Sequence, residues 1–175
     1  MTSDRYGTIE RTQDGGFVRF ERPLAYPIAD VWSAITEPSR LADWWPPFAG
    51  EVTVDLREGG KIAFTWPEGG ETQALEFTIL RLDEPTLLEH SHTSPGSWQR
   101  WELEPTEDGT CLRITYFVRE LDMAIERGDV IGAHYGLDRL ESALSGHPTP
   151  LDFVVFAELR AGYAKLNPPS SGVAG

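Results

Sequence analysis

Cysteine is nearly absent from this sequence. Cys111 is the single one among 175 residues, so no disulfide can form within the chain. Long apolar runs are absent too, since no segment approaches the roughly 20 residues with which a helix crosses a bilayer. The first residues, Met-Thr-Ser-Asp-Arg, lack the apolar segment of a secretory signal. We therefore expect a soluble, cytoplasmic protein that does not insert into membranes.

Basic residues are scarce. The chain has 15 lysines and arginines against 28 aspartates and glutamates, a formal net charge of −13. This excess of negative charge opposes binding to phosphate backbones and to anionic membrane surfaces. Nucleic-acid binding is therefore the function class that the composition argues against most clearly. A chain of 175 residues can bury a core of its own without a disulfide or a metal, so one domain is expected.

Residues 26–45 carry the most informative pattern in the chain. Their first apolar residues have the spacing of one helix face and are Ile28, Val31, Trp32 and Ile35. Pro27 suits the first turn, because its missing N–H would have no partner in the helix there. Pro38 disfavours continuation, because it pushes the preceding residue out of the helical conformation. A second short helix then ends in Trp44 and Trp45, which predicts an aromatic lid over a binding cavity.

Most of the remaining sequence alternates between apolar and polar residues, which is the period of a half-buried strand. The alternating segments are separated by short turns rich in glycine, such as Asp14–Gly16, Arg57–Gly60 and Pro67–Gly70. The apolar positions of these segments include Val52, Val54, Leu56, Ile62, Phe64, Trp66, Leu75, Phe77, Ile79, Trp101, Leu103, Leu112, Ile114 and Tyr116. Successive strands joined by short turns predict an antiparallel sheet with one apolar face.

A long helix is predicted after the sheet. Its apolar residues step by three and four along one stripe and are Val130, Ala133, Leu137, Leu140 and Leu144. Gly146 and Pro148 are typical of residues that end a helix. The last residues are rich in proline, serine and glycine and are expected to be disordered. The predicted organisation is one domain over residues 1–148, a helical extension over 149–166 and a disordered tail over 167–175.

The order of these elements resembles the helix-grip fold of the START-like (SRPBCC) superfamily, and within it the branch related to the activator of Hsp90 ATPase. The local motifs that carry the resemblance are Phe20–Leu24, Pro27–Pro38, Leu41–Trp45, Asp55–Gly60, Gly132 and Leu137–Leu140. The resemblance covers about residues 8–146. It implies an α+β fold in which a curved antiparallel sheet wraps around a long C-terminal helix, with two short helices between the first strands. Relatives are mostly described as binders of hydrophobic small molecules or lipids, and a minority act as cyclases or chaperone partners.

The sequence departs from this branch at two places. The last helix of relatives often carries a tryptophan just after its glycine, where this chain has Ala133. A methyl group in place of a bulky wall implies a larger or reshaped pocket. His90 and His92 stand where relatives often have aromatic residues on the cavity face.

The expected site is a cavity between the sheet and the long helix that holds a small aromatic, acyl or lipid-like ligand without catalysis. Such pockets are typically apolar and aromatic, with a few polar anchors. The candidate ligand-binding residues are Trp45, Phe48, Phe64, Trp66, His90, Trp101, Tyr116, Ala133 and His134. Trp45 and Phe48 are expected at the mouth, the other aromatic residues in the wall, and His90 and His134 as polar anchors.

Other interpretations of the same residues stay open. The aromatic residues could be plain core, which is the interpretation we adopt for Trp32 and Phe77. His90 and His92 lie on one face of one strand, but without a third ligand of fitting spacing they make a weak metal site, and neither metal nor cofactor is expected. His90 or His134 could instead act as the general base of a small cyclase or hydrolase. A chaperone-partner role is the third class.

Overall fold

The computed structural model describes residues 5–45 and 50–166. These residues form one sheet of eight antiparallel strands, in the spatial order β1-β2-β8-β7-β6-β5-β4-β3. The strands are β1 (Thr8–Thr12), β2 (Gly15–Leu24), β3 (Glu51–Val54), β4 (Lys61–Glu68), β5 (Glu71–Asp83), β6 (Leu87–Ser91), β7 (Trp98–Thr106) and β8 (Gly109–Val118). The predicted antiparallel meander is confirmed, and the pairing of β2 with β8 joins the N-terminal hairpin to its last strand.

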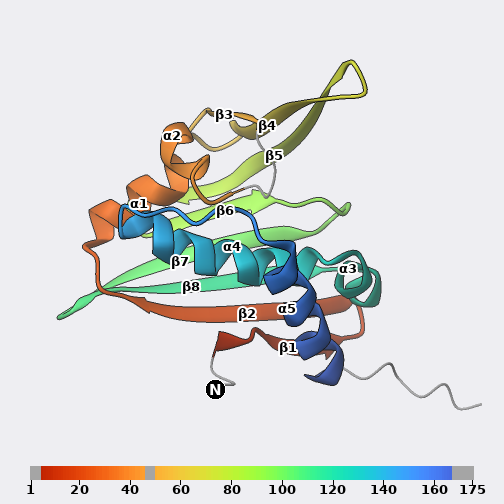
Figure 1. Cartoon of the computed structure of the whole chain (residues 1–175). Coiled ribbons are helices and arrows are strands. Elements are labelled where there is room, and N and C mark those ends of the chain that lie inside the picture. Colours follow the sequence, from red (N-terminus) through yellow and green to blue (C-terminus); the bar gives the residue numbers. More distant parts are fainter. Residues whose placement is uncertain (1–4, 46–49, 167–175) are drawn as a thin grey trace, which may run out of the picture.

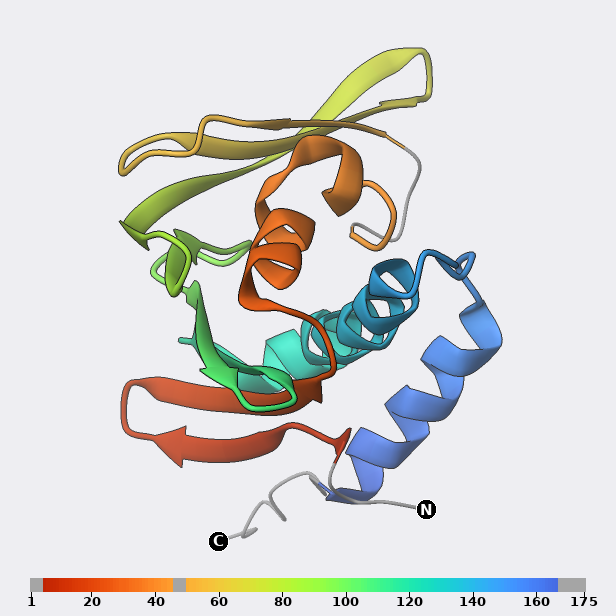
Figure 2. The ribbon, with the colours of Figure 1, turned by 90° about the vertical axis from the view of Figure 1, so that its left-hand side faces the viewer.

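The helices of these residues are α1 (Ile28–Thr36), α2 (Pro38–Leu41), α3 (Leu121–Arg127), α4 (Asp129–Leu144) and α5 (Phe153–Leu166). The sheet curves around α1, α2 and α4, as Figures 1 and 2 show from two directions. Helix α5 packs against α4 on the side that the sheet leaves uncovered (Figure 2). This is the predicted α+β helix-grip arrangement, with α1 and α2 between β2 and β3.

The boundaries of α1 and α2 follow from two prolines. Pro27 precedes the first turn of α1, and its carbonyl accepts hydrogen bonds from the backbone N–H groups of Asp30 and Val31, at 3.0 and 3.2 Å. Glu37 is extended, with φ −81° and ψ 128°, as expected for the residue before a proline. Pro38 then begins α2, so the chain turns between two short helices. Trp44 and Trp45 follow α2 and lie against the sheet.

The concave face of the sheet is the apolar one. In the paired strands β2 and β8, Val18 lies opposite Tyr116 and Phe20 lies opposite Ile114, and all four side chains are buried. The side-chain period of two sends every second residue to this face, which produces the alternation seen in the sequence. On the other face, Arg113 forms exposed ion pairs with its neighbours Glu21 and Glu104.

Helix α4 is covered on more than the face that its apolar stripe predicts. The buried stripe residues are Val130, Leu137, Leu140 and Leu144, whereas Ala133 is partly exposed. His134, Tyr135 and Arg139 are buried as well, on the flanks of the helix. Helix α5 accounts for part of this burial: the ring of Tyr135 packs edge-on against Phe156, and its hydroxyl accepts a hydrogen bond from the backbone N–H of Asp152.

Helix α3 was not part of the sequence prediction. It ends at Gly128, whose φ of +98° places it in the left-handed region that favours glycine. The chain reverses there and begins α4 at once, so Arg127 and Asp129 lie on either side of the turn. These two charged residues come close to the end of the candidate site described below.

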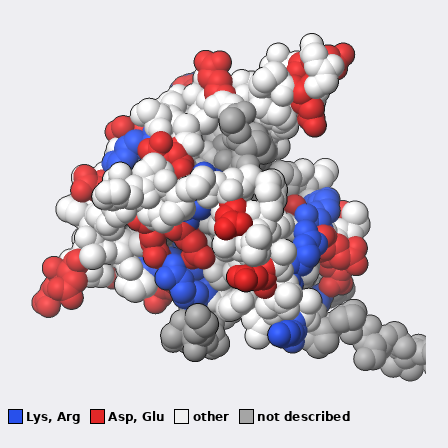
Figure 3. Space-filling view, in the orientation of Figure 1, with Lys and Arg blue, Asp and Glu red and all other residues white. Residues whose placement is uncertain are grey.

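The outer surface carries mixed charge. On the face shown in Figure 3, acidic side chains are scattered and basic side chains lie beside them in small groups. None of the helices in residues 5–45 and 50–166 combines the length and apolar character needed to cross a membrane. The tail expected at residues 167–175 lies outside the described residues.

Candidate functional site

Aromatic rings gather between the sheet and the end of α2. We call this group the aromatic cluster; its members are Trp44, Trp45, Phe64, Phe77, His90, His92, Trp101 and Tyr116. They come from the segment after α2 and from β4 to β8, so the cluster exists only when the sheet is assembled. Trp45 lies at its centre, because its ring contacts Phe64, Phe77, His90 and Trp101 with centroid distances of 5.1 to 6.2 Å.

Trp45 stacks flat on Phe77, with ring centroids 5.5 Å apart and an interplanar angle of 10°. The ring of Trp44, the preceding residue, also stacks against Trp45, with ring centroids 5.7 Å apart. The two tryptophans differ in exposure: Trp44 is buried, whereas Trp45 remains partly exposed. Trp45 therefore lies between the interior of the cluster and the surface.

Trp44 is anchored to the helices. Its indole N–H donates a 2.9 Å hydrogen bond to the carbonyl of Ala34 in α1. Its own carbonyl accepts a 2.7 Å hydrogen bond from the buried guanidinium of Arg139 in α4, whose Nε donates to the carbonyl of Thr149. Burial lowers the pKa of Arg139 from its ordinary value. These contacts fix the backbone beside Trp45 relative to α4.

His90 is fully buried, and both of its ring nitrogens have partners. Nε2 lies 3.1 Å from the indole N–H of Trp101, and Nδ1 lies 2.8 Å from the carbonyl of Ser91. An indole can only donate, so Nε2 accepts and the proton of the neutral ring is on Nδ1. Burial lowers the pKa of His90 from 6.5 to about 4. His90 is thus an uncharged support for Trp101 with no nitrogen to spare for a ligand.

His92 and Tyr116 form the end of the cluster nearest α3 and α4. Their ring centroids are 4.5 Å apart, and Nδ1 of His92 lies 3.1 Å from Oγ1 of Thr93. Burial first, then the charges of neighbouring His90 and Arg127, lower the pKa of His92 to about 3. Burial also raises the pKa of the Tyr116 hydroxyl above its ordinary value, so both groups are uncharged at neutral pH.

The remaining candidate residues that the structure describes lie on β4, β7 and α4. Phe64 and Trp101 are buried members of the aromatic cluster, and Trp66 lies two residues along β4, on the same face as Phe64, and is partly exposed. Ala133 shares the sheet-facing side of α4 with buried Leu137. Phe48 lies outside the described residues.

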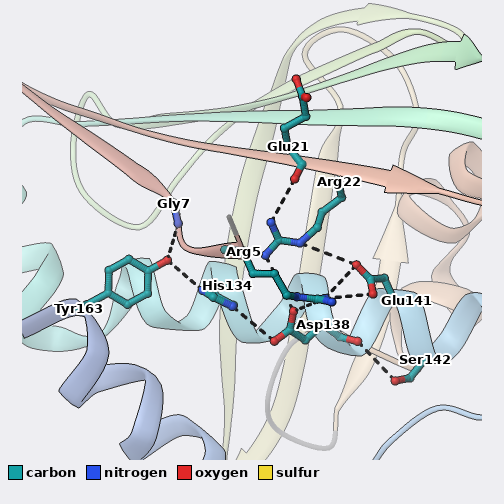
Figure 4. A network of polar contacts seen from close by, with 9 residues as sticks. All are labelled: Arg5, Gly7, Glu21, Arg22, His134, Asp138, Glu141, Ser142 and Tyr163. Carbon is teal, nitrogen blue, oxygen red and sulfur yellow. Dashed lines mark hydrogen bonds and ion pairs between the residues drawn. The ribbon is translucent and has the colours of Figure 1, made fainter. Parts of the chain in front are cut away.

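His134 lies elsewhere, on a flank of α4 that faces α5 and the N-terminal segment (Figure 4). Its Nδ1 lies 3.0 Å from the hydroxyl of Tyr163, and its Nε2 lies 3.4 Å from Oδ2 of Asp138. The Tyr163 hydroxyl also accepts a 2.9 Å hydrogen bond from the backbone N–H of Gly7. The aromatic rings that pack against the imidazole of His134 are those of Tyr6, Phe20 and Tyr163. The structure therefore does not bring His134 together with His90.

The His134 network continues into ion pairs, also drawn in Figure 4. Arg5 pairs with Asp138 at 2.8 Å and with Glu141 at 3.0 Å, and buried Arg22 lies within 4 Å of both carboxylates. Burial alone would raise the pKa of Asp138, but His134 and Arg5 outweigh it and hold that pKa below its ordinary value. These contacts tie the N-terminal segment, α4 and α5 together.

Phe77 is a core residue, as the sequence predicts, and it also lies within the aromatic cluster, which the sequence did not indicate. Phe77 stacks between Trp45 and His92, with centroid distances of 5.5 and 5.1 Å. Its alternation with Leu75 and Ile79 correctly puts it on the inner face, but the same is true of every core residue of β5. In residues 5–45 and 50–166, no group of three or more His, Cys, Asp or Glu side chains is placed to hold a metal ion.

Residues 25–145 match the family model described as activator of Hsp90 ATPase homolog 1-like protein. The chain belongs to this family. The match confirms the resemblance on which the fold was predicted, and it includes α1, α2, the strands from β3 to β8, α3 and the whole of α4. None of the curated proteins matches the sequence.

Several solved structures are similar over most of the chain. CalU16 from Micromonospora echinospora has 26% sequence identity and a TM-score of 0.68, covering 91% of this chain and 96% of that one. NE0264 from Nitrosomonas europaea has 22% identity and a TM-score of 0.66, covering 78% and 97%. EF2215 from Enterococcus faecalis, described as a conserved protein of unknown function, has 17% identity and a TM-score of 0.69, covering 92% of both. At these identities, the last two show the fold alone.

Proposed function

We propose that this protein binds a small hydrophobic ligand, aromatic or acyl in character, between the inner face of the sheet and α4, without catalysing a reaction. The observation that carries the proposal is the position of Trp45. Its ring packs across Phe64, Phe77 and Trp101 and yet remains partly exposed. A ligand that took up these contacts would bury apolar surface, which is worth about 25 cal/mol per Å² before the costs of ordering.

Partial exposure around the cluster supports a binding space rather than a closed core. Trp45, Trp66, His92 and Ala133 are all partly exposed. The inward residues next to them along the same elements are almost completely buried, such as Phe64 at 0% and Leu137 at 1% exposure. Protein interiors are closely packed, so partly exposed side chains at inward-facing positions are ones that a ligand could contact.

The electrostatics of the cluster support an uncharged ligand surface. The pKa values of His90 and His92, about 4 and about 3, keep both rings neutral at physiological pH. The nitrogens of His90 are occupied by Trp101 and Ser91, so it supplies neither charge nor a free base. An aromatic wall without a charge favours dispersion and stacking contacts over ion pairing.

Tryptophan fluorescence titration tests the proposal. A panel of flavonoid-like, naphthalene-based and fatty-acyl compounds should include members that change the emission and raise the melting temperature. Trp45→Leu should weaken their binding, while Trp98→Leu serves as the matched control, because Trp98 lies on the outer face of the sheet against Phe17 and Phe117. If no compound changes either signal in the wild-type protein, the proposal is wrong.

A general-base enzyme is the alternative that one observation favours, namely the approach of His134 to both a carboxylate and a tyrosine hydroxyl. In the binding proposal, the same contacts are structural and His134→Gln leaves ligand affinity unchanged.

A chaperone-partner role, prompted by the family's name, would instead give salt-sensitive capture of a purified Hsp90 by the acidic surface. Pull-down at several salt concentrations separates that role from ligand binding.

A further inference from the structure

The hydroxyl of Tyr116 is a buried polar group without a hydrogen-bond partner among the described residues. Tyr116 is 0% exposed and lies on the inner face of β8, between the buried side chains of Ile114 and Val118. Leaving a buried donor unpaired costs folding free energy, so each such group calls for an explanation. Building on the proposed function, we propose that this hydroxyl is the polar subsite of the ligand site and donates a hydrogen bond to an uncharged acceptor, such as a ketone or quinone carbonyl.

The surroundings of the hydroxyl do not supply that acceptor. Thr93 is near enough to lower the pKa of Tyr116, but its side chain does not meet the geometry of a hydrogen bond with the hydroxyl. His92 packs its ring against Tyr116 and directs Nδ1 to Thr93. Arg127 donates to Ser94 and Asp129, both at 2.7 Å. His92 and Arg127 thus form their hydrogen bonds with groups other than the Tyr116 hydroxyl.

Other buried polar groups in the same interior are paired. Tyr163 is also 0% exposed, yet its hydroxyl contacts both Gly7 and His134. The indole N–H groups of Trp44 and Trp101 both have acceptors. Nε of Arg22, the second unpaired buried atom among the described residues, lies 3.8 Å from a Glu141 carboxylate oxygen, so its charge is compensated. The Tyr116 hydroxyl has no such compensation.

Charge near the hydroxyl selects the kind of acceptor. The carboxylate of Asp129 is close enough to raise the pKa of Tyr116, and Arg127 opposes it while paired to that same carboxylate. A ligand carboxylate or phosphate would meet this carboxylate in a region of low polarity, which disfavours a second negative charge. A neutral carbonyl meets no such repulsion. The ligand class is therefore a hydrophobic ketone or quinone, with its apolar part toward Trp45 and Phe77.

Matched ligand pairs test the subsite. The probes are 2-acetylnaphthalene with 2-ethylnaphthalene and 9-fluorenone with fluorene, which differ by a carbonyl at nearly constant shape. In the wild-type protein, fluorescence titration should give the ketone an affinity about tenfold higher than the hydrocarbon, the order expected for one buried hydrogen bond. In Tyr116→Phe the two affinities should become equal, with the hydrocarbon affinity unchanged.

The outcomes separate this inference from the proposed function. If no probe binds and the wider panel also fails, the proposed function itself is wrong. If hydrocarbons bind but ketones gain nothing, or if the gain persists in Tyr116→Phe, the binding proposal stands and the carbonyl subsite is wrong. Tighter binding of 2-naphthoate than of 2-acetylnaphthalene would also overturn the choice of an uncharged acceptor.

A ligand-free measurement provides a second, independent test. Removing an unpaired hydroxyl should leave the urea midpoint unchanged or raise it, so Tyr116→Phe should not destabilise the protein. Tyr163→Phe is the matched control, because it removes a hydroxyl with two partners and should lower the midpoint. If both variants lower it equally, the Tyr116 hydroxyl already has a partner, such as a buried water, and the inference is overturned.

Discussion

The indole N–H of Trp101 donates a 3.1 Å hydrogen bond to Nε2 of His90, between adjacent strands β7 and β6. Because Nδ1 of the same ring is bound to the carbonyl of Ser91, the imidazole is fixed in one neutral form. The bond orients Trp101 toward Trp44 and Trp45. A histidine that the sequence marks as a ligand anchor is thereby a support for the aromatic wall, and its protonation state is tied to folding.

Stability should depend on pH through His90. Its pKa is about 4 in the folded state against an ordinary 6.5, so the unfolded chain takes up this proton first as the pH falls. The contribution is fully present above pH 6.5 and is lost between pH 6.5 and 4, amounting to about 3 kcal/mol. Urea unfolding of His90→Gln at several pH values should show a shallower loss in this window.

The control for this experiment is His147→Gln, since His147 is exposed and should leave the pH dependence unchanged. His92 acts in the same direction as His90, with a pKa of about 3. Asp138 keeps its contribution above its ordinary pKa of 3.8 and loses it as the pH falls from there toward its lowered pKa in the folded state, which is below the window. An identical slope in wild type and His90→Gln would contradict the buried neutral imidazole.

Ala133→Trp should be tolerated by the fold while ligand binding is lost. Ala133 is partly exposed on the sheet-facing side of α4, so the added ring should enter space that the ligand needs. Leu137→Trp, one turn later at a residue that is 1% exposed, is the control and should cost about 1–3 kcal/mol through overpacking. Urea midpoint and affinity are measured on both variants. Equal destabilisation would show that Ala133 is packed as tightly as Leu137.

Asp138→Asn should destabilise the protein by about 1–3 kcal/mol, because it removes a charge that faces Arg5, Arg22 and His134 in a partly buried setting. Glu104→Gln is the matched control. It breaks an exposed ion pair with Arg113 on the outer face, where such pairs contribute about 0–1 kcal/mol. Chemical denaturation of the two variants compares them directly, and a cost for Glu104→Gln equal to that for Asp138→Asn would rule out a special role for the network.

Gly132→Ala should stabilise the protein by about 0.5–1 kcal/mol, because glycine is a poor helix former and a methyl group at this position in α4 meets no atom within 4 Å. Gly128→Ala is the opposite case. Its φ of +98° and the crowding by Arg160 and Phe156 make an alanine there strained, so the variant should lose stability. Thermal unfolding of both variants gives the sign of each effect, and destabilisation by Gly132→Ala would contradict the open space beside α4.

Local periodicity accounts for the parts of the fold that could be read from the sequence. The alternation along β2, β4 and β8 and the stripe of α4 depend only on which residues face an apolar layer, and neighbouring residues reveal that. Pro27 and Pro38 act on their own backbone, so the limits of α1 and the start of α2 were also predictable. The predicted extension of the second helix to Trp44 and Trp45 is wrong, because α2 ends at Leu41. Helix α3 was not predicted, because a helix of seven residues with two buried ones is too short to show a helical period in the sequence.

The composition of the candidate site depended instead on contacts between distant segments. Trp45, Phe77 and His90 meet because β5 pairs with β6, with Ile79 opposite His90, and the segment after α2 packs over them. His134 looks equivalent to His90 in the sequence, yet α5 covers its flank of α4 and gives it Tyr163 as a partner. Periodicity states that a side chain is buried but not which group it meets, because the partner comes from another part of the chain. Local patterns therefore predict the fold, whereas tertiary packing determines which buried polar groups are paired and which, like the Tyr116 hydroxyl, have no partner among the described residues.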